Sequence, residues 1–162
     1  MERHVELREQ TTVEYFKEQV ESALVRQHLQ AGDLTEYYLV NLLCRYVRPD
    51  FADLEHGEPL AVRLARALQT GGSEQRARLR SLGDFSLFTA GFFSDSFNRS
   101  LVDIDYYMQL GERAYGSLAR QDDALGDVFD ELADKFPALV DVLAEVSEST
   151  ALGSNADVMR LY

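Results

Sequence analysis

Proline is scarce in this chain and stands only where a helix could begin or end. The 162 residues contain three prolines, Pro49, Pro59 and Pro137. Proline is tolerated in the first turn of a helix and disrupts its interior, so the long stretches without proline favour helices. Strict alternation of apolar and polar residues, which is typical of half-buried strands, is rare. The sequence therefore predicts an all-α fold.

Apolar residues at helical spacing divide the chain into about seven helices. The segment 34–47 is apolar on nearly every side, a pattern typical of a helix that is buried all round. We expect it to be the central helix of a compact bundle or orthogonal array. The first helix is expected over residues 12–31. Another is expected over 84–99, beginning at Asp84 as its cap after Gly83.

The chain shows no internal repeat and no shift in composition that would mark a second domain. Its length also suits one domain, since single domains commonly have roughly 100–200 residues. We therefore expect one helical domain over residues 1–162. The segments 1–10 and 148–162 are expected to form a less ordered arm and tail.

Charge and cysteine content narrow the class of protein. The formal net charge is -12, from 16 Lys+Arg against 28 Asp+Glu. This balance argues against general nucleic-acid binding, which depends on basic side chains that neutralise phosphates. The single cysteine, Cys44, excludes an internal disulfide and is expected to be a buried, inert thiol. The N-terminal residues lack the apolar core of a signal peptide, and no apolar run is long enough for a membrane helix. We expect a cytoplasmic protein without membrane contact.

The charge is unevenly distributed along the chain. Residues 60–82 contain five arginines and one glutamate, a net of +4, whereas residues 121–150 contain nine acids and one lysine, a net of -8. These segments are either solvated outer faces of helices or complementary docking surfaces, between copies or toward a partner. We call the five arginines the arginine patch: Arg63, Arg66, Arg76, Arg78 and Arg80.

Two polar residues interrupt the apolar segment 34–47. Asn41 and Arg45 are four residues apart and therefore share one helix face. A buried polar group left unpaired costs about 1–3 kcal/mol, so both need partners. One interpretation is a structural network; the other is a ligand pocket in which Arg45 binds an anion and Tyr37 or Tyr38 lines the wall. The acidic partners considered for the network are Asp95, Asp103 and Asp105.

The expected helix 84–99 carries a second set of candidates. Asp84, Gly91 and Asp95 fall on one of its faces. Gly91, like Gly111 further along the chain, is a small residue at which two helices could cross closely. The alternative is that Gly91 leaves a gap for a cofactor.

The three histidines lack the spacing of a metal site, so we expect no bound metal. His28 continues the apolar series of the first helix and falls near its C-terminal end. The helix dipole favours a cation there, which gives His28 a structural role. Its alternative role is that of a ligand-binding residue.

The string LGDFS at 82–86 resembles the LGDLSGG string of the distal helix in haem oxygenases. Upstream, QAGDLTEYYLVNLLCRYV at 30–47 is similar in layout to the early helix pair of that fold. The resemblance covers about 25 residues and implies a haem site with His28 as the nearest candidate axial ligand. It departs from the family at Leu87 and Phe88, which stand where the family has glycines.

Two hypotheses for function follow. The first is a non-enzymatic interaction or regulatory protein that forms a homodimer, with no cofactor and no catalytic residues. The absence of nucleophile sets, phosphate-binding loops and dinucleotide fingerprints favours it. The alternative is a helical protein that binds a small ligand or cofactor, with a haem-oxygenase-like site between the helices 34–47 and 84–99.

Overall fold

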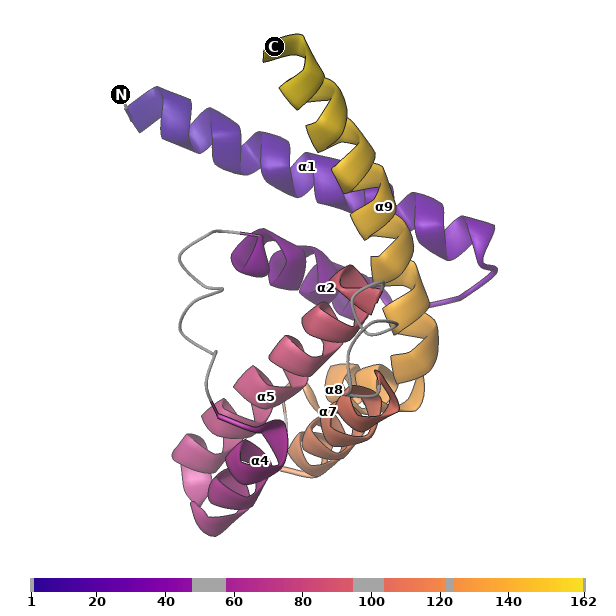
Figure 1. Cartoon of the computed structure of the whole chain (residues 1–162). Helices are drawn as coiled ribbons and strands as arrows, with labels where there is room; N and C mark the ends of the chain where they lie inside the picture. Colours follow the sequence, from indigo (N-terminus) through magenta and orange to yellow (C-terminus); the bar gives the residue numbers. More distant parts are fainter. Residues whose placement is uncertain (1, 48–57, 95–103, 122–123, 162) are drawn as a thin grey trace.

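Helices account for nearly all of the described chain (Figure 1). The computed structural model describes residues 2–47, 58–94, 104–121 and 124–161, with side chains only between 12 and 150. No strand occurs in these ranges, which confirms the all-α prediction. The helices are α1 (Glu2–Arg26), α2 (Asp33–Tyr46), α4 (Leu60–Gln69), α5 (Gly72–Phe92), α7 (Ile104–Ala119), α8 (Gly126–Asp134) and α9 (Phe136–Leu161).

The helix α5 occupies the middle of the array and packs against α2, α4, α7 and α9. Figure 1 shows it running beside α7, with α4 across its N-terminal end. Small residues permit these close approaches. A Cβ atom added to Gly91 of α5 would lie 2.5 Å from the Cβ atom of Leu143 in α9. Gly91 is therefore a packing position, as one of its two interpretations predicted.

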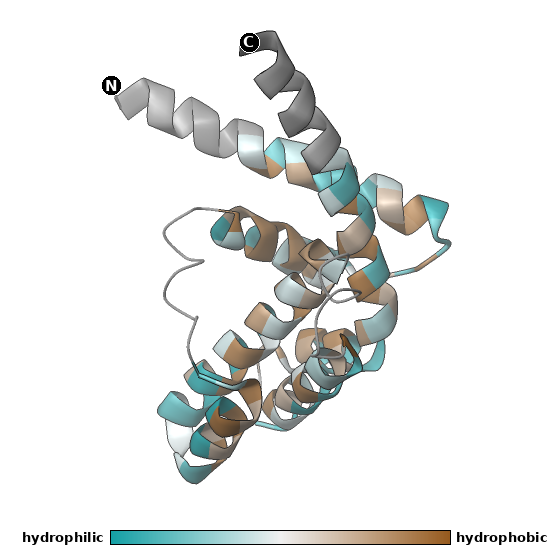
Figure 2. Ribbon diagram, viewed as in Figure 1, coloured by the Kyte–Doolittle hydropathy of each residue, from teal (hydrophilic) through white to brown (hydrophobic). Residues whose placement is uncertain are grey.

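The first and last helices cross at the end of the molecule away from α4 (Figure 1). Two hydrogen bonds join α1 and the turn after it to α9. The hydroxyls of Tyr15 and Thr150 lie 3.2 Å apart, and Nε2 of Gln27 donates to the backbone oxygen of Asp141 at 3.2 Å. Figure 2 shows hydrophobic residues along much of α2 and hydrophilic residues at the outer end of α4 and α5.

The helix α2 is buried on one side and exposed on the other. It packs against α1, α5 and α8 through seven buried residues. Leu34 and Tyr37, however, are 64% and 66% exposed. Helix α2 is therefore buried on one face only and not on every side as expected. The helix in the middle of the array is α5. The longer α5, with its glycines at the crossings, can contact more neighbours.

Two helix boundaries differ from those expected. The first helix starts at Glu2 and ends at Arg26, because His28 adopts a positive φ of 54° that the helix cannot contain. The helix α5 runs from Gly72 to Phe92 without a break. The prediction that a helix begins at Asp84 is therefore wrong, and Asp84 lies in a helix interior.

Helical backbone covers residues 2–11 and 151–161, and the predicted lower order of the arm and tail stays a prediction. Within the described ranges, no helix combines the length and apolar character that crossing a membrane requires.

Candidate functional site

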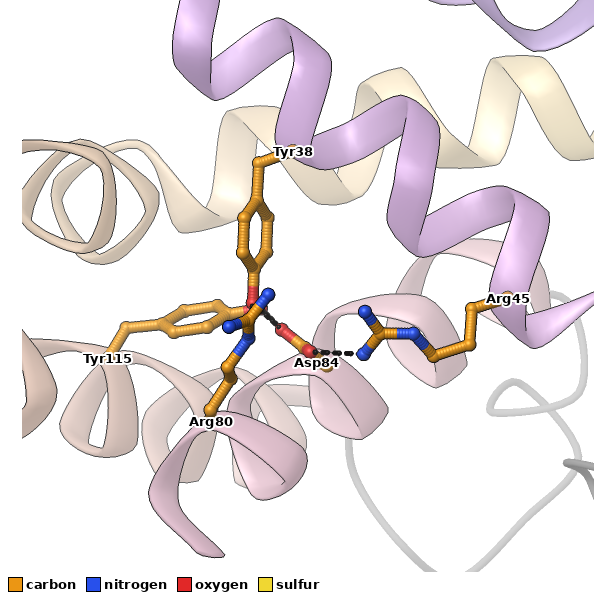
Figure 3. Close-up of polar contacts among 5 residues, drawn as sticks. All are labelled: Tyr38, Arg45, Arg80, Asp84 and Tyr115. Atoms are coloured by element: carbon orange, nitrogen blue, oxygen red, sulfur yellow. Dashed lines mark hydrogen bonds and ion pairs between the residues drawn. The ribbon is translucent and has the colours of Figure 1, made fainter. Parts of the chain in front are cut away.

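A buried carboxylate in the interior of α5 organises the main polar site of the described chain (Figure 3). The hydroxyls of Tyr38 and Tyr115 both donate to Oδ1 of Asp84, at 2.6 and 2.7 Å. Nη1 of Arg45 donates to Oδ2 at 3.4 Å. Nε of Arg80 donates to the Tyr38 hydroxyl at 3.1 Å. We call these five residues the Asp84 cluster.

Three helices position the Asp84 cluster. Tyr38 and Arg45 come from α2, Arg80 and Asp84 from α5, and Tyr115 from α7. Figure 3 shows the two tyrosines converging on Asp84 from one side while Arg45 approaches from the other.

Gly83 makes room for the ring of Tyr115. A Cβ atom at Gly83 would lie 2.6 Å from Cε1 of Tyr115. The glycine before Asp84 therefore lets the Tyr115 hydroxyl reach the carboxylate.

The environment of Asp84 opposes its charge. Burial raises the pKa of this carboxyl, and the hydrogen bonds from Tyr38 and Tyr115 counteract only part of that effect. Burial, together with the nearby carboxylate, also raises the pKa of both phenols. The two tyrosines therefore stay protonated at neutral pH and act as hydrogen-bond donors.

A pocket of about 660 Å³ opens beside the Asp84 cluster, between α2 and α5. A volume of this size suits a small organic ligand. Its wall is mainly apolar or aromatic, with polar groups at a few points. The lining residues are Leu34, Tyr37, Tyr38, Asn41, Leu42, Cys44, Arg45, Arg80, Asp84 and Leu125.

The pocket supplies groups for binding. Oδ1 of Asp84 already accepts two short hydrogen bonds, whereas Oδ2 accepts one long bond from Arg45. Arg45 lines the pocket and has a side chain that is 39% exposed. A ligand that displaces Arg45 could therefore donate a hydrogen bond to Oδ2, while the arginines attract negative charge.

Most of the predicted ligand-binding residues meet at this pocket. Tyr37, Asn41, Arg45 and Asp84 all line it. Asn41 plays no part in the Asp84 cluster, because its Nδ2 donates to the backbone oxygen of Tyr37 at 3.0 Å. Ligand binding by these four residues stays a prediction.

The other predicted residues lie elsewhere. His28 is in the turn after α1 and lines a separate hollow with Glu21 and Glu36. Gly91 packs against α9, and Asp95 lies outside the described residues.

The acidic partner of Arg45 differs from those expected. Arg45 pairs with Asp84, because α2 lies against the middle of α5. Asp95 and Asp103 lie outside the described residues, and Asp105 is exposed on α7.

Sequence reasoning gave Tyr38 only as an alternative wall residue, assigned Arg80 to the arginine patch and did not identify Tyr115. Arg80 is four residues before Asp84 on the same helix, a spacing that would have indicated the pair had Gly83 not been interpreted as a break. Tyr38 follows the predicted Tyr37 and points to the buried side of α2. Tyr115 carries no signal in the sequence beyond its place beside the inward Ala114.

The arginine patch divides into two parts. Arg63, Arg66 and Arg78 line a hollow of about 300 Å³ between α4 and α5. Arg66 pairs with Glu58 at 2.6 Å, and Arg78 pairs with Glu74 at 3.1 Å. Arg80 instead turns to Tyr38 and lies over its ring. Arg76 is half-buried, and docking through the patch stays a prediction.

The cysteine differs from the expected inert, buried thiol in one respect. Cys44 is half-buried and lines the pocket beside Arg45. It is therefore within reach of whatever occupies the pocket.

The haem site implied by the resemblance does not fit this arrangement. Leu87 and Phe88, at the glycine positions of that family, are buried in the core, and Phe88 stacks on Tyr46. They leave no open backbone for a haem to approach. His28 lines a different hollow and cannot serve as an axial ligand at the α2–α5 pocket.

Metal ligands do not come together in the described part of the chain, where no group of three His, Cys, Asp or Glu side chains is placed to hold an ion. Comparison of the chain with protein-family models, curated proteins and solved structures finds no match. The Asp84 cluster and its pocket are therefore the features of the described chain that bear on its function.

Proposed function

We propose that this protein binds a small organic molecule in the pocket between α2 and α5. The observation that carries the proposal is the Asp84 cluster at the pocket wall, in which a wholly buried carboxylate is held by two tyrosines. Burying a carboxylate is costly, and replacing buried ionic groups by apolar residues is often neutral or stabilising. A buried carboxylate that stabilises the fold no better than apolar residues would, and that faces a pocket, is better explained by binding.

The wall of the pocket supports the same proposal. Leu34 and Tyr37 are far more exposed than large apolar residues usually are, and both lie at the pocket. A largely apolar ligand would cover these side chains and gain their burial, about 25 cal/mol for each Å² removed from water.

A bulky side chain inside the pocket should weaken the binding of a neutral apolar probe. We expect wild-type protein to bind N-phenyl-1-naphthylamine saturably, and Asn41→Trp to lower that affinity at least tenfold, about 1.4 kcal/mol. Asn41 lines the pocket and is half-buried, so the indole would occupy the space of the probe. The measurement is a fluorescence titration.

The control for this experiment is Ala65→Trp, which adds the same indole at an exposed position of α4. It should bind the probe as the wild type does. Equal affinity in Asn41→Trp and wild type, or no saturable binding by the wild type, would contradict the proposed pocket.

Self-association is a second candidate function, and the same exposed apolar residues favour it. Leu34 and Tyr37 are three residues apart on α2, so they form one apolar surface. Such a surface is a common feature of interfaces between subunits. We propose it as the contact of a homodimer with a regulatory or adaptor role.

Light scattering tests the dimer. We expect a mass of twice 18.4 kDa for the wild type, and a monomer mass for the double variant Leu34→Ser/Tyr37→Ser. Val62→Ser, at an exposed apolar residue of α4, is the control and should leave the dimer intact. A wild-type monomer mass that does not change with concentration would exclude self-association.

A further inference from the structure

The charge at the α2–α5 pocket is opposite in sign to that of the whole molecule. The chain carries a net charge of -12. Among the described residues, the carboxyl and guanidinium side chains that line this pocket are those of Arg45, Arg80 and Asp84. Their sum is +1 with Asp84 ionised and +2 with Asp84 protonated. The described lining is therefore positive in either state of the carboxyl.

The geometry of the two arginines leaves donors for a ligand. The hydrogen bond from Arg80 to Tyr38 uses Nε and leaves the N–H donors of both Nη groups available within the part of the chain that the structure describes. Arg45 contacts Asp84 through Nη1 alone, at the long distance of 3.4 Å. A guanidinium offers five donors in a planar fork that matches the oxygens of a carboxylate or sulfonate.

The position of Arg80 is also fixed before a ligand arrives. Its guanidinium carbon lies 5.1 Å from the centre of the Tyr38 ring, and Tyr38 is itself held by Asp84. The stacking and the hydrogen bond therefore reduce the rotamer freedom that Arg80 would lose on binding. This contrasts with Arg66 and Arg78, whose charges are paired with glutamates on an exposed surface.

We infer that the ligand of this pocket is an organic anion, with an apolar or aromatic body against Leu34, Tyr37 and Leu125 and an acidic group on Arg80 and Arg45. The inference rests on the proposed function and adds its chemical class. Arg80 is the residue that determines the preference for an anion. The net negative charge of the molecule does not oppose this, because solvent-exposed charges beyond about 8–10 Å are largely screened at physiological salt.

Two probes of nearly the same shape test the inference. The anion 8-anilinonaphthalene-1-sulfonate differs from neutral N-phenyl-1-naphthylamine mainly by its sulfonate. We expect the wild type to bind the anion at least tenfold more tightly. Arg80→Gln should remove most of this preference while changing the affinity for the neutral probe less than threefold.

Two further variants keep the test interpretable. Arg66→Gln removes one positive charge outside the pocket and should leave both affinities unchanged. Arg80→Lys keeps the charge and should retain part of the preference for the anionic probe. A variant that failed to fold would lose this preference entirely. Helix content of each variant is checked by circular dichroism.

The outcomes separate the two proposals. Equal binding of both probes by the wild type, blocked by Asn41→Trp, would overturn the anion inference and leave the pocket in place. An equal fall for both probes in Arg80→Gln would likewise overturn it. Failure of both probes to bind saturably would overturn the proposed function itself.

Discussion

Replacing Asp84 by alanine is expected to lower the free energy of unfolding by about 2–5 kcal/mol. The substitution removes the acceptor of two buried hydroxyls, those of Tyr38 and Tyr115. Tyr115 is fully buried, so water cannot replace its lost partner without entering the core, whereas Tyr38 lines the pocket and loses less. Leaving each group unpaired costs about 1–3 kcal/mol. Urea denaturation at pH 7 measures the loss.

The variant Asp84→Asn separates the hydrogen bonds from the charge. Its side-chain oxygen can still accept from both tyrosines, so the expected loss is smaller, about 1 kcal/mol. The amide lacks the titration of the carboxyl. The comparison of Asp84→Asn with wild type at different pH values therefore reports the cost of the buried charge.

The direction of this pH dependence follows from the raised pKa of Asp84. The folded protein holds the proton more tightly than the unfolded chain, whose aspartates titrate near 3.9. The contribution of Asp84 to stability is therefore fully present below about pH 4 and is lost as the pH rises through the raised pKa. Asp84→Asn should gain stability relative to wild type between pH 4 and pH 7. A relative loss over that range would show that the pKa is lowered instead.

The helical class could be predicted because it depends on local signals. Proline placement and apolar spacing indicate helices directly, and the expected segment 34–47 differs from α2 by one residue at each end. The boundaries that differ lie where local signals compete with packing. Gly83 has the residue type of a helix end, yet α5 continues through it. A glycine stands at this position because the ring of Tyr115 occupies the space that a side chain would need.

Tyr37, Asn41 and Arg45 of α2 and Asp84 of α5 could be predicted as candidates for one pocket, but the pairing of Arg45 with Asp84 could not. Arg45 and Asn41 were noticeable because polar residues interrupt an apolar segment. Their partner depends on which part of α5 lies against α2, and that register is a tertiary property absent from either segment alone. Tyr115 comes from a third helix, so no sequence spacing connects it to Asp84.

Gly111 and Gly116 lie in the same helix, α7, yet substitution by alanine should change stability in opposite directions. A Cβ atom at Gly111 would collide with the ring of Phe136 and lie 3.0 Å from the Cβ atom of Ser86. Phe136 is fully buried at the start of α9 and Ser86 is in the middle of α5, so neither can yield easily. Overpacking of this kind costs about 1–3 kcal/mol. The position was predicted as a close helix crossing, and the structure confirms it.

At Gly116 the added methyl group meets no atom within 4 Å. Gly116→Ala should therefore show only the helix preference of alanine over glycine, a gain of about 0.5–1 kcal/mol. Urea denaturation of both variants gives an expected difference of about 1.5–4 kcal/mol between them.

A second substitution tests the cause of the loss at Gly111. In the double variant Gly111→Ala/Phe136→Leu the smaller side chain removes the ring that the methyl group strikes. The two changes should therefore cost less together than the sum of their separate effects, by about 0.5–3 kcal/mol. Additive losses would show that the Phe136 ring does not limit the approach of α7, and that the close crossing has another cause.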